Sequence, residues 1–342
     1  MCKVFVIGDL HFREKKLIQA TEFTEKFFPI LSKNKPDFIV ILGDILDTNN
    51  ISRIESFIFA YDFFEKCSRI ANTFVLIGNH DYMNEKQFLT DKHFFVPLKK
   101  YENIVVVDNI VNYKFSENLL FTFVPYVPPN RFKEALISSE IDWELSTCIF
   151  AHQEFKGSVP FGICEEEWDV DYPLVISGHI HEHKKFQDNL FYTGSSMQIK
   201  CDENPDKKVW LFEFQEDGEY KVTDFDLNLS KIVKRNITIE EIENLDFSDF
   251  DFKKNNYVFH IPATKDQITI FKKSDVYNFL KKNCKVFFIL VDENNENNED
   301  IEIIEHDNFE KVLLSLLDKK PEKIKECYSE ILSGNANTNI IF

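Results

Sequence analysis

Short apolar runs recur along the first part of the chain, and each is followed at once by polar residues. Five of these runs are four or five residues long, a length and apolar content typical of fully buried strands. They span residues 3–7, 38–42, 73–77, 147–151 and 174–177. Most of the run ends adjoin a glycine, which allows the backbone to turn sharply. The pattern therefore predicts five buried strands, each ending at a polar cluster.

Two stretches with helical spacing separate the first three runs. Residues 15–31 lie between the first and second runs, and residues 54–70 lie between the second and third. A strand, a helix and a strand in this order indicate β-α-β units, so the sequence predicts an α/β fold with a parallel sheet. Because ligands bind at the carboxyl edge of the strands in open α/β sheets, we expect the polar clusters to form a ligand site.

The polar clusters are rich in aspartate, asparagine and histidine. In chain order they are Gly8-Asp9-Leu10-His11, Gly43-Asp44, Gly78-Asn79-His80-Asp81, His152-Gln153 and Gly178-His179-Ile180-His181. Taken singly, each has a plain explanation, such as a helix cap for Asp44 or a hydrogen-bonded loop position for a histidine. Five in succession favour a metal site, because oxygen and imidazole ligands without sulfur suit two divalent ions that share one carboxylate. We take Asp44 as the centre of that site.

The last third of the chain predicts a smaller unit. Alternating aromatic residues over 210–214 predict the last sheet strand, and we expect a domain boundary near Asn228. Beyond it, strands over 257–261 and 285–291 flank a helix over 274–282. The sequence therefore predicts a small α+β unit that could cap the site.

Three acidic or terminal stretches complete this pattern. The run 292–300 (DENNENNED) predicts a solvated loop. Apolar residues at helical spacing after Pro321 predict a terminal helix, either packed on its own domain or docked to a partner. Residues 165–169 are expected to form a solvated acidic loop, with contact to substrate or metal left open.

Composition narrows the class of protein. The 342 residues are 44% hydrophobic and 15% aromatic, as in a globular protein, and no apolar run approaches the roughly 18 residues of a membrane span. We therefore expect a soluble cytoplasmic protein, or a nuclear one in a eukaryotic or viral setting, without membrane association. The formal net charge of −18 disfavours unaided binding to a long phosphate backbone, although bound divalent ions would offset several carboxylates.

The ordered motifs DxH, GDxxD, GNHD, H and GHxH resemble those of the calcineurin-like metallophosphoesterase superfamily over about residues 3–225. The resemblance implies an α/β fold, a two-sheet α-β-β-α sandwich with a smaller C-terminal α+β cap domain. Residues 1–228 would be the catalytic domain, and residues 229–342 an acidic cap or partner-binding domain. One ion would be held by Asp9, His11, Asp44 and His181. The other would be held by Asp44, Asn79, His152 and His179, so that Asp44 bridges the two.

The same resemblance assigns roles around the substrate. His80 would lie beside the phosphate and donate to the leaving oxygen or to the transition-state charge, and Asp81 would orient its ring. Asp47 stays unassigned, because some nucleases of the superfamily have a catalytic histidine in that neighbourhood and this chain has none there.

Residues 44–48 and 178–181, with the small-residue turn at 192–196, are similar to Mre11/SbcD-type DNA nucleases of repair and recombination. The Pro-rich segment usual after the second motif is replaced by Asn49-Asn50-Ile51-Ser52. The similarity implies an exonuclease or endonuclease with two divalent ions, manganese first, with iron or zinc also fitting. DNA and an SbcC/Rad50-type ATPase would be its partners, and a homodimer is open. The alternatives are a phosphatase or phosphodiesterase for a small molecule or phosphoprotein, and a scaffold without turnover.

Overall fold

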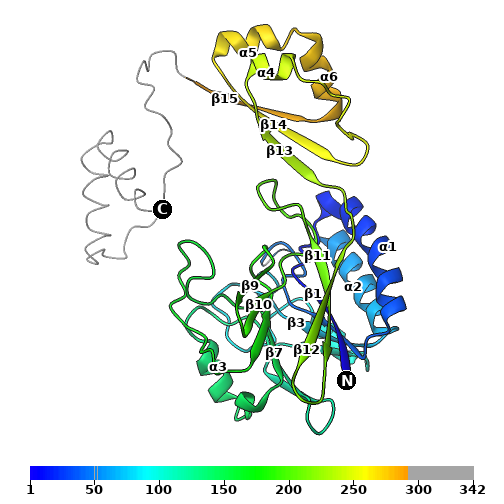
Figure 1. Ribbon diagram of the computed structural model, residues 1–342, viewed down its shortest axis with the longest axis vertical. Coiled ribbons are helices and arrows are strands. Elements are labelled where there is room, and N and C mark those ends of the chain that lie inside the picture. Colours follow the sequence, from blue (N-terminus) through cyan, green and yellow to red (C-terminus); the bar gives the residue numbers. More distant parts are fainter. Residues whose placement is uncertain (50, 52, 292–342) are drawn as a thin grey trace, which may run out of the picture. The chain divides into compact units, whose positions relative to one another are not determined.

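The computed structural model describes residues 1–49, 51 and 53–291. The chain is an α/β protein with two six-stranded mixed sheets and a third sheet of three strands (Figure 1). Met1–Ile289 forms one compact unit. The boundary expected near Asn228 stays a prediction. The acidic loop over 292–300 and the helix expected after Pro321 lie outside the described residues.

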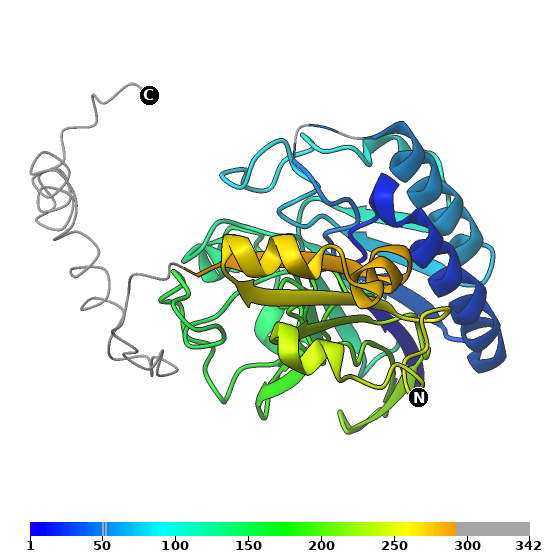
Figure 2. The ribbon, with the colours of Figure 1, turned by 90° about the horizontal axis from the view of Figure 1, so that it is seen from above.

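The first sheet contains three of the five predicted strands. Its order is β12-β11-β1-β2-β3-β4, with β1 to β4 parallel and β11 and β12 antiparallel. The strands are β1 (Cys2–Ile7), β2 (Phe38–Ile41), β3 (Asn72–Leu76), β4 (Ile104–Val107), β11 (Lys208–Phe214) and β12 (Tyr220–Asp226). The short helix η1 (Glu14–Lys16) precedes α1 (Leu17–Asn34), and α2 (Ile54–Ser68) follows β2. Both predicted helices are therefore confirmed, and Figure 2 shows them side by side.

The second sheet contains the other two predicted strands. Its order is β5-β6-β7-β8-β10-β9, with the inner four strands parallel and the two edge strands antiparallel. The strands are β5 (Val111–Lys114), β6 (Leu120–Val124), β7 (Cys148–Ala151), β8 (Leu174–Ser177), β9 (Lys184–Gln187) and β10 (Leu190–Tyr192). The helical segments beside this sheet and at the end of the first are α3 (Phe132–Ser138), η2 (Val96–Lys100) and η3 (Trp143–Leu145).

Apolar cores on both faces of the sheets explain why their central strands read as continuous apolar runs. In β1, Val4 faces the core between the two sheets, whereas Phe5 faces the core under α1 and α2. Phenylalanine is the most frequent residue of the core between the sheets, and Phe74 of one sheet stacks on Phe123 of the other with ring centroids 4.0 Å apart. A third core joins α3 to the second sheet. These cores hold the two sheets with the carboxyl ends of their parallel strands at one site.

The third sheet has a core of its own. It contains β13 (Ile232–Asn236), β14 (Asn256–Ala263) and β15 (Lys285–Leu290), with helices α4 (Ile239–Glu243), α5 (Lys265–Phe271) and α6 (Asp275–Asn283). Thr238, Thr264 and Ser274 cap the three helices. The two strands and the helix expected here are confirmed, whereas a role as a cap stays a prediction. Across the described residues, no helix combines the length and apolarity needed to cross a bilayer.

Candidate metal centre

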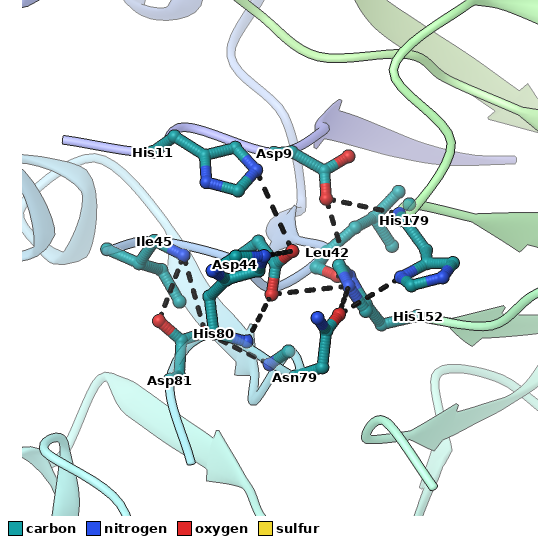
Figure 3. A network of polar contacts seen from close by, with 12 residues as sticks. Asp9, His11, Leu42, Asp44, Ile45, Asn79, His80, Asp81, His152 and His179 are labelled. Atoms are coloured by element: carbon teal, nitrogen blue, oxygen red, sulfur yellow. Dashed lines mark hydrogen bonds and ion pairs between the residues drawn. The ribbon is translucent and has the colours of Figure 1, made fainter. Parts of the chain in front are cut away.

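The carboxyl ends of five strands meet at one place, three from the first sheet and two from the second (Figure 3). The loops after these strands carry all nine side chains expected to form the site. They are Asp9 and His11 after β1, Asp44 after β2, Asn79, His80 and Asp81 after β3, His152 after β7, and His179 and His181 after β8. The described contacts bring these loops together, as the resemblance implies.

Unusual backbone conformations turn several of these side chains into the site. His11, Asp44 and His179 have positive φ angles of 43°, 48° and 74°. Residues with a side chain rarely adopt this region, and such strain is concentrated at functional sites where the surrounding structure maintains it. Gly78 permits the close approach of the loop after β2, because a Cβ at this position would overlap the backbone nitrogen of Asp44.

Asp9, His11 and His181 form the first of two possible ion sites. One ligand atom from each lies within 4.8 Å of the others. The Nε2 atoms of His11 and His181 face each other at 3.1 Å, and Oδ2 of Asp9 is buried without a hydrogen-bond partner among the described residues. Buried polar atoms normally have partners, so this unpaired oxygen beside two imidazole nitrogens fits a cation.

The second possible ion site is formed by Asp44, His152 and His179. Their ligand atoms also lie within 4.8 Å of one another. The Oδ1 atom of Asn79 lies 3.1 Å from His152 Nε2 and 3.0 Å from His179 Nδ1, which places the amide oxygen in the same group. Burial, together with the charge of His152, lowers the pKa of His179 to about 4. A low pKa favours the neutral imidazole that metal ions require.

Asp44 lies between the two groups. Its Oδ2 is 3.7 Å from His11 Nε2, and its Oδ1 is 3.4 Å from His152 Nε2. Burial alone would raise the pKa of Asp44, but the charge of His152 and the hydrogen bond to it, with His11 and His80, outweigh burial and lower the pKa. Each carboxylate oxygen of Asp44 thus faces one of the two groups, which fits the expected role of Asp44 as a bridge between two ions.

Residues 2–183 match the family described as Calcineurin-like phosphoesterase. "Putative phosphoesterase 078R" of Invertebrate iridescent virus 3 is 35% identical over 284 residues, which cover 81% of this chain and 81% of that protein. "Putative phosphoesterase 244L" of Invertebrate iridescent virus 6 is 36% identical over 291 residues, which cover 82% of this chain and 98% of that protein. This chain belongs to the calcineurin-like metallophosphoesterase family.

It is therefore a metal-dependent phosphoesterase with two His/Asp groups suited to a dinuclear centre. The Mre11/SbcD subgroup stays a prediction, as do the separate roles of the nine site residues. A solved structure, that of hypothetical protein PH1004 from Pyrococcus horikoshii OT3, aligns with a TM-score of 0.34 and 11% identity. It covers 66% of this chain and 88% of that one, and at this score the likeness is too weak to assign function.

Residues outside the motifs fix the histidine rings of the phosphoesterase. His152 Nδ1 lies 2.6 Å from the carbonyl oxygen of Leu42, and His181 Nδ1 lies 2.8 Å from Oε1 of Glu203. Such partners set which ring nitrogen carries the proton and leave Nε2 free to bind an ion. Glu203 in turn accepts a hydrogen bond from the Ile199 amide and pairs with Lys207 at 3.2 Å. Sequence reasoning missed Glu203, because nothing in its surroundings marks it out from the other acids nearby.

Asp81 contacts the backbone of the loop after β2. Its buried carboxylate accepts hydrogen bonds from the backbone amides of Ile45, Leu46 and Gly78 at 3.0 to 3.1 Å. Within the described residues these are the hydrogen bonds of the carboxylate and none joins it to the ring of His80, so the orienting role of Asp81 stays a prediction. Residues 79–81 form a turn, in which the Asp81 amide donates to the carbonyl of Gly78 at 3.2 Å, and the Asp81 carboxylate faces the loop after β2. It ties that loop to the loop after β3.

Asp47 makes the contact that was expected of Asp81. Its carbonyl oxygen lies 2.8 Å from Nδ1 of His80. The other ring nitrogen, Nε2, lies 4.0 Å from Oδ2 of Asp44, and the side chain of His80 is 34% exposed. His80 is therefore held at the rim of the centre with one ring nitrogen available. Nothing in the sequence signals this contact, since a backbone carbonyl has no residue signature.

Proposed function

We propose that this phosphoesterase hydrolyses the phosphodiester bonds of DNA with two divalent ions. The family assignment supports the chemistry, and a lysine-lined groove beside the start of α1 is the observation that carries the choice of DNA. Repair and recombination are the processes that such a nuclease would serve.

The donor set limits the ions. When bound, two divalent ions would supply Lewis-acid polarisation of the phosphate and activation of a water molecule. Nitrogen and oxygen donors suit manganese, our first choice, and also iron and zinc. The two groups described above would hold one ion each, with Asp44 shared and Asn79 contributing to the second.

His80 has the position of a proton donor. The Asp47 carbonyl can only accept a hydrogen bond. Nδ1 of His80 therefore carries a hydrogen and donates a hydrogen bond to this oxygen. Nε2 then faces the space beside Asp44. A second proton on Nε2 would make the ring a donor to the oxygen of the leaving group, and positioned proton transfer of this kind typically contributes about 10²–10⁴ in rate.

The groove has a volume of about 570 Å³ and lies between the start of α1 and residues of the third-sheet region. Both walls belong to the compact unit Met1–Ile289. Five lysines and one acid, Glu22, line it, although the whole chain carries 58 acidic against 40 basic residues. The lysines are Lys15, Lys16, Lys253, Lys254 and Lys285.

The groove shares a wall residue with a neighbouring pocket. Lys15 also lines a second pocket of about 260 Å³, whose wall includes Asp47. A lysine-lined groove in a protein of net charge −18 fits a polyanion that extends beyond the scissile phosphate. A small phosphate ester would not need it, so we favour DNA over the phosphatase alternative.

The test compares substrates of different size. Supercoiled plasmid, a DNA hairpin and a small aryl phosphodiester are incubated with the protein and Mn²⁺, with a chelator-treated sample as control. We expect hydrolysis of all three, and none after chelation. Hydrolysis of the aryl phosphodiester alone would favour the small-molecule alternative, and no hydrolysis with any metal would favour the scaffold. Within the described residues nothing identifies an SbcC/Rad50-type ATPase partner or a homodimer, and both stay predictions.

A further inference from the structure

The loops after β1 and β2 lie side by side and are joined by backbone hydrogen bonds. The His11 amide donates to the carbonyl of Asp44 at 2.9 Å, and the Phe12 amide donates to the carbonyl of Ile45 at 2.8 Å. Phe12 and Leu46 form an isolated parallel bridge. These contacts fix the two loops relative to each other. The last of them is made by Phe12.

An ion pair continues the contact where the backbone bonds stop. Nη2 of Arg13 lies 2.5 Å from Oδ1 of Asp47. Both side chains are partly buried, with exposed fractions of 29% and 25%. From Asp47 to the start of α2 at Ile54 the described positions belong to neither a helix nor a strand. No regular secondary structure therefore fixes the position of Asp47. The ion pair of its side chain with Arg13 fixes it instead.

Asp47 contacts two of the site histidines at once. Its Oδ1 is 3.6 Å from Nδ1 of His11, and its carbonyl oxygen is 2.8 Å from Nδ1 of His80. The Nε2 atoms of both rings point toward Asp44, at 3.7 Å and 4.0 Å from its Oδ2. Asp47 thus contacts the Nδ1 side of both the His11 and the His80 ring, and the Nε2 side of each ring faces the metal centre.

We infer that Arg13 and Asp47 form a positioning pair that holds His80 and His11 in the geometry needed for hydrolysis. Arg13 fixes the carboxylate of Asp47, the fixed residue presents its carbonyl to His80, and the carboxylate faces His11. This inference rests on the phosphoester hydrolysis proposed above. Partly exposed ion pairs contribute little to stability, so the pair acts through geometry and not by holding the fold together.

Arg13 has one competing explanation. Its Nε is buried and has no hydrogen-bond partner among the described residues. A phosphate of the substrate could bind there directly, and Arg13 would then act on substrate affinity. The positioning pair predicts instead a loss in kcat with KM little changed, because the substrate contacts are kept while the His80 ring is misplaced.

The experiment combines kinetics with two readouts that do not need turnover. Arg13→Gln, Asp47→Asn and the double variant are compared with the parent on an aryl phosphodiester, for kcat and KM. Mn²⁺ affinity is measured by calorimetry, and the histidine ring nitrogens are observed by NMR at fixed pH without metal. Arg69→Gln is the matched control, because Arg69 is 70% exposed, pairs with Glu65 at 2.6 Å and lines neither of the two pockets described above.

We expect each single variant to lower kcat by about 10–100-fold, the usual cost of losing a partner behind a ligand. The double variant should be no slower than the worse single variant, since the two side chains act as one unit. Arg13→Lys should restore part of the rate, the ring signals of His80 should shift in Asp47→Asn, and Arg69→Gln should match the parent.

Losses that multiply in the double variant would overturn the inference, as would an effect confined to KM or ring signals of His80 that do not move. If the parent hydrolyses no phosphodiester, the proposed function fails, and the ring signals and Mn²⁺ affinity still decide whether the pair positions the histidines. A variant that fails to fold leaves Arg13→Lys and the NMR comparison as the deciding measurements.

Discussion

Asp44 is the side chain on which the two groups of the centre depend, because one oxygen faces each group. Asp44→Asn keeps the volume and removes the charge. Losing an outer partner costs about 10–100-fold, so losing the shared carboxylate should cost more than about 100-fold in kcat/KM for every phosphoester. Elemental analysis should find fewer bound ions beside an unchanged fold by circular dichroism. A variant that unfolds, or that binds two ions and turns over normally, would contradict the bridging role.

His80 separates chemistry from metal binding. His80→Ala should keep both ions and slow turnover by about 10²–10⁴-fold, with a smaller loss for an aryl phosphodiester whose leaving group is a weak base. Kinetics on two substrates of different leaving-group basicity, with metal analysis, measure this. His260→Ala in β14 is the control, because it removes a partly exposed histidine of the third sheet. Loss of an ion from His80→Ala, or equal losses on both substrates, would reject the proton-donor role.

At this scale the sequence predicted side chains better than their partners. Each motif residue follows an apolar run, and this placement brought all nine to one site. Glu203 and the Asp47 carbonyl could not be predicted, because they reach the rings of His181 and His80 from parts of the chain with no spacing rule. The resemblance assigned Asp81 to the ring of His80, whereas in the structure its buried carboxylate accepts hydrogen bonds from backbone amides.

Among the elements, the strands buried on both faces were predictable and the edge strands were not. Continuous apolar runs such as β2 mark burial under two cores. The edge strand β5 has an intermediate and exposed alternation, and β13 is short and largely polar, so neither stands out from the loops. The runs also could not show that β7 and β8 belong to a second sheet, because a buried run carries no information about its neighbours.

The close approach of the loops after β2 and β3 depends on Gly78. A Cβ at this position would overlap both the backbone nitrogen and the Oδ1 of Asp44. Gly78→Ala should therefore push the loops apart, at a cost of about 1–3 kcal/mol in unfolding free energy and with weakened metal affinity. Urea unfolding and calorimetry with Mn²⁺ measure the two effects.

Gly218→Ala separates the effect on the centre from a general loss of stability. Gly218 has a φ of 89°, and no atom lies within 4 Å of the position that a Cβ would occupy there. Alanine at this position therefore adds backbone strain of about 1–2 kcal/mol without a clash. Both variants should be less stable, and only Gly78→Ala should bind metal more weakly. Equal metal affinity in the two would show that the loops tolerate separation.

Over the whole molecule, the uneven distribution of charge is the feature that bears on substrate size. A net charge of −18 repels nucleic acid, and steering toward a long anion then requires a local reversal of sign. The groove beside α1 provides this reversal with five lysines. Lys16 donates to the carbonyls of Gln198 and Ile199, and Lys254 donates to Asn228, so these two also have structural contacts.

In the described part of the chain no ion pair engages any of the five lysines, and Lys15, Lys253 and Lys285 differ from the other two in that their side chains also make no hydrogen bond. Replacing all three by glutamine should weaken DNA binding and reduce the slope of log K against log salt by about 2–3, because each phosphate contact contributes about 0.7–0.9. Hydrolysis of a small aryl phosphodiester should be unchanged, because the metal centre is kept. Fluorescence anisotropy with a labelled DNA at several salt concentrations measures this. Replacing Lys33, Lys100 and Lys114, which lie outside the groove, removes the same charge and should change binding far less. Equal weakening by the two triple variants would show that net charge, and not the groove, governs DNA binding.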